Sequence, residues 1–143
     1  MGEPGEIRSD IDANATRLAD KLASPVDLYL LAVVEGRIAG TAALDGTSLA
    51  RFAHSATLGL AVSREYWGRG IGRALVEALL RWADASGLVR VSLEVVETNT
   101  RAIRLYESLG FEHEGRLRCC RKHGDVYLDN HQMARIRTSL APA

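Results

Sequence analysis

Residues 60–73 read LAVSREYWGRGIGR and join a predicted strand to the start of a predicted helix. Glycine occupies every second position from Gly68 to Gly72, so the chain can turn tightly and bring backbone N–H groups close to a ligand. The first turn of a helix offers unpaired N–H donors and the positive end of a dipole, and Arg69 and Arg73 add positive charge. This stretch therefore predicts a strand–loop–helix cradle for a diphosphate group.

Two common phosphate-binding motifs do not fit this loop. A dinucleotide fingerprint counted from Gly68 or from Gly70 needs a further glycine where Arg73 or Leu75 stands. The Gly-Lys-Ser/Thr ending of a P-loop is also absent. On their own, the glycines are equally consistent with a loop that only caps a helix.

Apolar periodicity predicts the elements on either side of the loop. A strong amphipathic helix begins after Gly72 and ends at Gly87, because its apolar side chains recur at helical spacing. The other predicted segments are helices at residues 11–22 and 99–109 and strands at residues 28–34, 38–44, 52–62, 89–96, 111–121 and 126–136. This order predicts a mixed α/β fold with one sheet and helices on both of its faces.

Length and charge narrow the possible functions. The 143 residues predict a single domain over residues 1–143, with a flexible segment at residues 1–9. The 18 basic residues balance 18 acidic ones, which argues against nucleic acid or an anionic membrane as the main partner. No apolar run approaches a membrane span and residues 1–8 lack the pattern of a secretion signal, so we expect a cytoplasmic location.

The cysteines and histidines do not form a recognisable site. Cys119 and Cys120 are neighbours without a third cysteine as a partner, so we expect reduced thiols. The four histidines show no paired ligand spacing, and no metal site is predicted.

A second group of polar residues lies within residues 93–111. Asn99 and Tyr106 are seven residues apart, which places them on nearly one helix face, ~10 Å from each other. Glu94 points away from the sheet face that its apolar neighbours bury, so a carboxylate, an amide and a phenol converge at one strand–helix junction. Each also has an ordinary explanation: Tyr106 as a core aromatic, Asn99 as an N-cap, and Glu94 as a solvated residue with Glu97 as the competing base.

Two segments together, LAVSREYWGRGIGRALVEALL at residues 60–80 and LEVVETNTRAIRLYESLGF at residues 93–111, resemble the GCN5-related N-acetyltransferase (GNAT) family. The resemblance extends over about residues 28–136. Residues 94–111 look most like the ribosomal-protein alanine acetyltransferases. The ending GFEHEGRLRCCRKHGDVYLDNHQMAR at residues 110–135 looks more like bacterial amino-acid and polyamine acetyltransferases.

The resemblance implies a mixed, mostly antiparallel sheet whose central pair of parallel strands splays apart, with the pantetheine arm of acetyl-CoA as a cosubstrate in the gap. It implies Glu94 as general base and Tyr106 as the acid that protonates the CoA thiolate. By position in the family motifs, the residues that contact the cosubstrate are Leu60, Ala61 and Val62 for pantetheine, Gly68, Arg69, Gly70, Ile71, Gly72 and Arg73 for the diphosphate, and Asn99 for the cofactor arm.

The resemblance implies direct acetyl transfer to a primary amine of an amino acid, a polyamine or a peptide N-terminus, with a backbone N–H of the strand that ends at Val62 as the oxyanion donor. The amine is mostly ammonium at neutral pH, so Glu94 would take its proton, and a backbone N–H near Leu60 or Val62 would stabilise the oxyanion. Two alternatives remain open. The same fold could bind acetyl-CoA as a sensor without turnover, or the chain could be a nucleotide-binding α/β protein.

The sequence departs from the family pattern at three places. Trp67 stands where relatives usually have Gln or Arg, and Thr57 where many carry a carboxylate, which places more weight on Glu94. Only 27 residues precede Leu28, whereas relatives usually begin with a strand and one or two helices. We therefore expect an unpaired sheet edge at residues 28–34, covered either by a second subunit in a homodimer or by residues 5–8.

Overall fold

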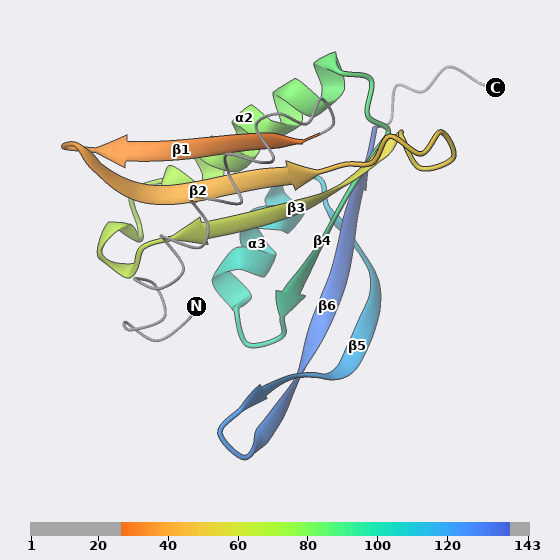
Figure 1. The fold of residues 1–143 in the computed structure, drawn as a ribbon. Helices are drawn as coiled ribbons and strands as arrows, with labels where there is room; N and C mark the ends of the chain where they lie inside the picture. The colour runs from red at the N-terminus through yellow and green to blue at the C-terminus, as the bar shows by residue number, and fades with distance from the viewer. Residues whose placement is uncertain (1–26, 138–143) are drawn as a thin grey trace.

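A computed structural model of the protein describes residues 27–137 (Figure 1). The predicted helix over residues 11–22, the segment at residues 1–9 and the strand-edge cover at residues 5–8 lie outside the described residues.

The described residues form a six-stranded sheet with the order β1-β2-β3-β4-β6-β5. All neighbouring strands are antiparallel except β3 and β4, which are parallel. Within residues 27–137, β1 is an edge strand. The strands are β1 (Leu28–Val34), β2 (Arg37–Asp45), β3 (Ser55–Val62), β4 (Arg90–Val96), β5 (Glu112–His123) and β6 (Val126–Ile136).

Two helices, α2 (Ile71–Ala85) and α3 (Thr100–Ser108), pack on the same face of this sheet, and a short 3₁₀ turn, η1 (Arg64–Tyr66), precedes α2. A β-carbon added to Gly72 of α2 would lie 3.6 Å from side-chain atoms of both Leu105 in α3 and Leu60 in β3. The sequence predicts helices on both faces, and within residues 27–137 both helices lie on one of them. Among the residues described, no helix combines the length and the apolar character that crossing a bilayer requires.

The core lies between the sheet and these two helices. Strand alternation in β4 buries Val91, Leu93 and Val95 on the helix side, whereas Glu94 is exposed on the other side. The amphipathic stripe of α2 completes the core with the buried side chains of Leu75, Val76, Leu79, Leu80 and Ala83.

The parallel strands β3 and β4 separate soon after they meet. They are paired only over Ser55–Thr57 and Arg90–Ser92. Beyond these residues β3 stays paired with β2 as far as Val62, while β4 stays paired with β6 as far as Val96. Figure 1 shows the two strands diverging as a V. The predicted mixed sheet with a splayed parallel pair is therefore confirmed.

Three predicted boundaries are wrong. α2 begins at Ile71, not after Gly72. β3 begins at Ser55, not at residue 52, because Phe52 N donates to Leu49 O at 2.9 Å and Ser55 N donates to Phe52 O at 3.0 Å. These bonds close turns and leave Phe52 59% exposed. β5 continues to His123, so the last hairpin turns over residues 124–125 alone and not over residues 122–125.

Candidate active site

The separation of β3 from β4 leaves backbone groups of β3 without a strand partner. Ser63 N donates to Ala39 O at 2.9 Å, which makes this a hydrogen-bonded pair of the β2–β3 ladder. Hydrogen-bonded and non-hydrogen-bonded pairs alternate in an antiparallel ladder. The backbone groups of Ala61 therefore bond to β2, whereas those of Leu60 and Val62 face the slot. Ala61, expected among the backbone contacts, has its N–H and C=O directed away from the slot.

The same reasoning identifies the groups that β4 presents. Arg137 N donates to Val89 O at 2.8 Å, so the odd-numbered residues of β4 bond to β6. The backbone groups of Glu94 and Val96 consequently face the slot. Val62 O accepts from Trp67 Nε1 and Val96 O accepts from Asn99 N, so these two carbonyls are occupied. The N–H groups of both strand edges and the carbonyls of Leu60 and Glu94 remain without a strand partner in the described sheet, an arrangement that suits an extended ligand with amide groups of its own.

The glycine-rich loop leads into an uncapped helix start. Gly68 and Gly70 have φ values of +78° and +77°, in the left-handed region where a side chain is strained. Gly70 is the N-cap of α2, and no side chain caps the helix. The first N–H groups of α2, from Ile71 to Arg73, thus remain free for an anion, as the sequence predicts.

Trp67 organises the outer side of this loop. Its indole Nε1 donates to Val62 O at 2.9 Å, which closes the loop back onto the end of β3. The guanidinium carbons of Arg64 and Arg101 lie 5.6 Å and 5.7 Å from the centroid of the Trp67 ring. Arg69 lies 5.3 Å from the ring centroid of Tyr66. The loop therefore carries a concentration of positive charge beside the free N–H groups.

Sequence reasoning missed Arg64 and Arg101. One signal was available, because Arg101 stands in the first turn of α3, where a cation opposes the helix dipole. A cation at the positive end of a helix dipole is locally unfavourable, so its position suggests a role outside the helix, such as binding an anion.

The side chain of Arg73 is occupied elsewhere. Its Nη2 donates to Ser108 Oγ at 2.8 Å, and its Nη1 lies 3.6 Å from Glu77 Oε1. The guanidinium therefore ties α2 to α3, and the part of Arg73 that remains available to an anion is its backbone N–H.

Asn99 forms the N-cap of α3, as one of its two interpretations predicted. Its Oδ1 accepts a hydrogen bond from Ala102 N at 3.2 Å. The amide NH₂ of the same side chain has no partner among the described residues. Capping occupies the oxygen and leaves two donors for a ligand.

Tyr106 is largely buried on α3, with 6% of its surface exposed. Its ring packs edge-to-face against Phe111, with centroids 5.6 Å apart. Burial raises the pKa of the Tyr106 phenol to about 12. The phenol is therefore protonated throughout the neutral range and can donate a hydrogen bond, but it cannot act as a base there.

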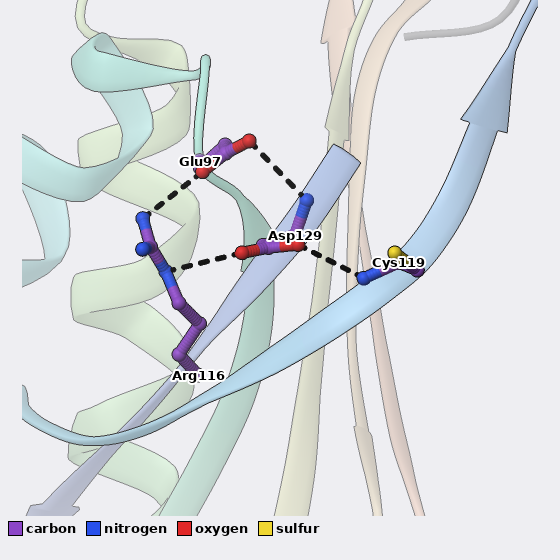
Figure 2. A network of polar contacts seen from close by, with 4 residues as sticks. All are labelled: Glu97, Arg116, Cys119 and Asp129. Atoms are coloured by element: carbon purple, nitrogen blue, oxygen red, sulfur yellow. Dashed lines mark hydrogen bonds and ion pairs between the residues drawn. The ribbon is translucent and has the colours of Figure 1, made fainter. Parts of the chain in front are cut away.

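The two candidate bases have different surroundings. Glu97 Oε2 accepts from Arg116 Nη2 at 3.0 Å, and its Oε1 accepts from Asp129 N at 3.3 Å (Figure 2). Glu94 is exposed and has no hydrogen bond or ion pair within the described part of the chain. The geometry leaves Glu94 free to take a proton and holds Glu97 in a structural network.

That network joins β4, β5 and β6 near the end of the slot. The Asp129 carboxylate accepts from Cys119 N at 2.9 Å and lies 3.4 Å from Arg116 Nε. Figure 2 shows the Arg116 guanidinium in contact with the carboxylates of both Glu97 and Asp129. Since Glu97 directly precedes the turn into α3, these bonds fix the strand end from which Asn99 and α3 depart.

The diverging strands and the uncapped start of α2 form a site whose geometry suits a phosphorylated, extended ligand. The sequence model of the acetyltransferase (GNAT) family matches residues 3–111. The L-amino acid N-acetyltransferase AaaT of Escherichia coli is 31% identical over 122 residues, covering 85% of this chain and 74% of that protein.

A second sequence relative and a solved structure are also acetyltransferases. The ribosomal protein bS18-alanine N-acetyltransferase of Escherichia coli is 47% identical over 52 residues, covering 36% of this chain and 35% of that protein. The crystal structure of a GNAT-family acetyltransferase from Streptococcus pneumoniae matches with a TM-score of 0.80 at 29% identity, over 85% of this chain and 74% of that one.

The chain belongs to the GNAT acetyltransferase family. It is an N-acetyltransferase by class. The cosubstrate of the family is acetyl-CoA. The resemblance read from residues 60–80 and 93–111 is confirmed.

Proposed function

We propose that this protein transfers the acetyl group of acetyl-CoA to a primary amine by direct attack on the thioester. The observation that carries this proposal is the slot, where the backbone groups of Leu60 and Val62 face those of Glu94 and Val96. The free N–H groups of α2 lie at the end of the loop that follows β3 and fit the diphosphate.

Glu94 is proposed as the general base. An ammonium cannot attack a thioester, so a carboxylate must accept its proton directly or through water. Glu94 is exposed, free of partners in the described residues, and rooted in a strand whose backbone faces the slot. Glu97 is a weaker candidate because Arg116 and Asp129 occupy both of its oxygens.

The backbone N–H groups of Leu60 and Val62 are proposed as donors to the oxyanion that forms during attack. Both face the slot, and Trp67 Nε1 already bonds to Val62 O, which orients this peptide segment. Donors that are fixed before the reaction stabilise developing charge without reorganising.

Tyr106 is proposed as the hydrogen-bond donor to the sulfur that leaves. A thiol has an ordinary pKa near 8.5, and the Tyr106 pKa is about 12. Complete proton transfer from the phenol to a thiolate is therefore uphill by roughly 5 kcal/mol. Stabilisation of the thiolate by a hydrogen bond fits this pKa better than full protonation, which the sequence motif implied.

The acceptor is proposed to be a primary amine of an amino acid, a polyamine or a peptide N-terminus. Two of the relatives are named for acetylating L-amino acids and an alanine of a ribosomal protein. We propose the cytoplasm as the compartment, because Cys119 and Cys120 are exposed and free, which suits reducing conditions.

The test is acetyl transfer from acetyl-CoA to a panel of amines, followed by thiol release. Glu94→Gln should lower kcat/KM by about 10²- to 10⁴-fold, the usual contribution of a general base. Glu97→Gln is the matched control and should lower it by less than about 10-fold, because its role is structural.

Tight binding of CoA without transfer to any amine would contradict the proposal and favour a sensor of the same fold. A loss of activity in Glu97→Gln equal to that in Glu94→Gln would contradict the assignment of the base.

A further inference from the structure

Within residues 27–137, the arginines that lie against the Trp67 ring have no carboxylate partner. Arg64 and Arg101 both lie against the Trp67 ring, and neither forms an ion pair within the described residues. Arg101 reaches across the loop from α3, since its Nη2 would lie 3.3 Å from a β-carbon at Gly68. Two guanidinium groups from distant parts of the sequence thus converge on one indole beside the glycine-rich loop.

This arrangement is electrostatically unfavourable in the absence of an anion. Two like charges share one aromatic ring, and Arg101 also stands at the positive end of the α3 dipole. The whole chain has a formal net charge of zero, so the excess positive charge is local. Arginines held on a rigid aromatic platform are suited to bidentate recognition of phosphate.

The diphosphate alone does not account for these arginines. The uncapped N–H groups of α2 and the turns at Gly68 and Gly70 already supply donors for it. The remaining anionic group of acetyl-CoA is the phosphate on its ribose 3′-oxygen, which carries close to two negative charges at neutral pH.

We propose that Arg64 and Arg101, held on the Trp67 ring, bind the 3′-phosphate of CoA and make the protein selective for CoA over dephospho-CoA. This inference rests on the proposed function and assigns the nucleotide end of the same site. The Trp67 indole, which is bonded to Val62 O, links this phosphate subsite to the strand edge that lines the slot.

The test is the dissociation constant of CoA and of dephospho-CoA, measured by titration calorimetry with the full chain. The wild-type protein should bind CoA about 10- to 100-fold more tightly, as expected for one or two charge-assisted hydrogen bonds. Arg101→Gln should weaken CoA binding by about 10-fold and change dephospho-CoA binding by less than about 2-fold.

Arg104→Gln is the matched control, because Arg104 is an exposed arginine on the same helix and makes no ring contact with any residue from 27 to 137. It should change both dissociation constants by less than about 2-fold. Equal weakening of both ligands by Arg101→Gln would overturn the inference, since the guanidinium would then serve the diphosphate. Equal affinity of the wild-type protein for both ligands would overturn it as well.

Different results would contradict the proposed acetyl transfer and the proposed phosphate subsite. If the wild-type protein binds neither CoA nor dephospho-CoA, the proposed function itself is wrong, and the inference falls with it. If both ligands bind and acetyl transfer occurs but the selectivity is absent, the proposed function stands and only the phosphate subsite is wrong.

Discussion

The contacts of Glu94 and Glu97 with other side chains and backbone groups decide which of them is available as a general base. Both are glutamates near the end of β4, and sequence spacing alone ranks them almost equally. Arg116 and the backbone N–H of Asp129 hold Glu97, whereas Glu94 faces the other side of the sheet without a partner in the described residues. These contacts come from β5 and β6, so they are not visible in the local sequence around residue 94.

Tyr106→Phe tests the role of the phenol as a hydrogen-bond donor. The Tyr106 hydroxyl has no hydrogen bond within the described residues, so the substitution should leave stability nearly unchanged. We expect kcat to fall by about 10- to 100-fold and the affinity for CoA to change by less than about 3-fold. Steady-state kinetics and titration calorimetry measure the two effects.

The pH dependence of kcat provides a second test of Tyr106. Because burial raises the pKa of the phenol to about 12, the group stays protonated and contributes no basic limb below about pH 11. A basic limb between about pH 8 and about pH 10 that disappears in Tyr106→Phe would show a phenol with a much lower pKa, contrary to this account.

At the scale of elements, the start of α2 depends on its glycines unequally. Gly70 has a φ of +77° and open space around it, so its constraint is conformational. Gly72 lies within the helix, and a β-carbon there would make ordinary contacts at 3.6–3.7 Å with Leu60, Val62 and Leu105. The three alternating glycines of the motif are therefore not equivalent.

Gly70→Ala and Gly72→Ala form a matched pair that tests this difference. Gly70→Ala should lower the free energy of unfolding by about 1 kcal/mol and weaken CoA binding, because a side chain is strained in the left-handed region. Gly72→Ala should raise the free energy of unfolding by up to about 1 kcal/mol and change CoA binding by less than about 2-fold. Urea unfolding and calorimetry measure both; equal loss of binding in the two variants would contradict the assignment.

Periodicity predicted most elements, but it did not predict where β3 and β4 part. The end of α2 just before Gly87, the N-cap at Asn99 and strand β6 follow from local signals. The divergence of β3 from β4 was predicted only through the family resemblance. The apolar pattern of β3 is that of one continuous strand and does not mark where its pairing with β4 ends. Arg64 and Arg101 could not be paired from the sequence, since their contact runs through Trp67 and requires the packing of α3 against the loop.

At the scale of the whole molecule, a pair of charges ties the end of α2 to the sheet. Arg135 of β6 donates to both oxygens of Asp84 at 3.0 Å and 2.9 Å. The hydrogen bond from Arg135, opposed in part by desolvation, lowers the pKa of the Asp84 carboxyl from its ordinary value of 3.8. A lowered pKa in the folded state means that the stabilisation is present above that ordinary value and is lost as the pH falls through the folded pKa.

Asp84→Asn should therefore destabilise the protein in a pH-dependent way. Because the carboxylate is partly exposed, we expect a loss of roughly 0.5–1 kcal/mol in the free energy of unfolding at neutral pH. The difference from the wild type should shrink as the pH falls below about 3.8. Urea unfolding over a pH series measures it. A difference that stays constant into the acid range would show that the ion pair is not its cause.

We expect the open edge of β3 to receive the cosubstrate as it would receive an additional strand. Amide hydrogen exchange, followed residue by residue by NMR with and without acetyl-CoA, tests it directly. We expect the N–H groups of Leu60 and Val62 to become protected by about 10-fold or more on binding, while Ala61, already bonded to β2, changes little. Unchanged exchange at Leu60 and Val62 under saturating acetyl-CoA would contradict the account.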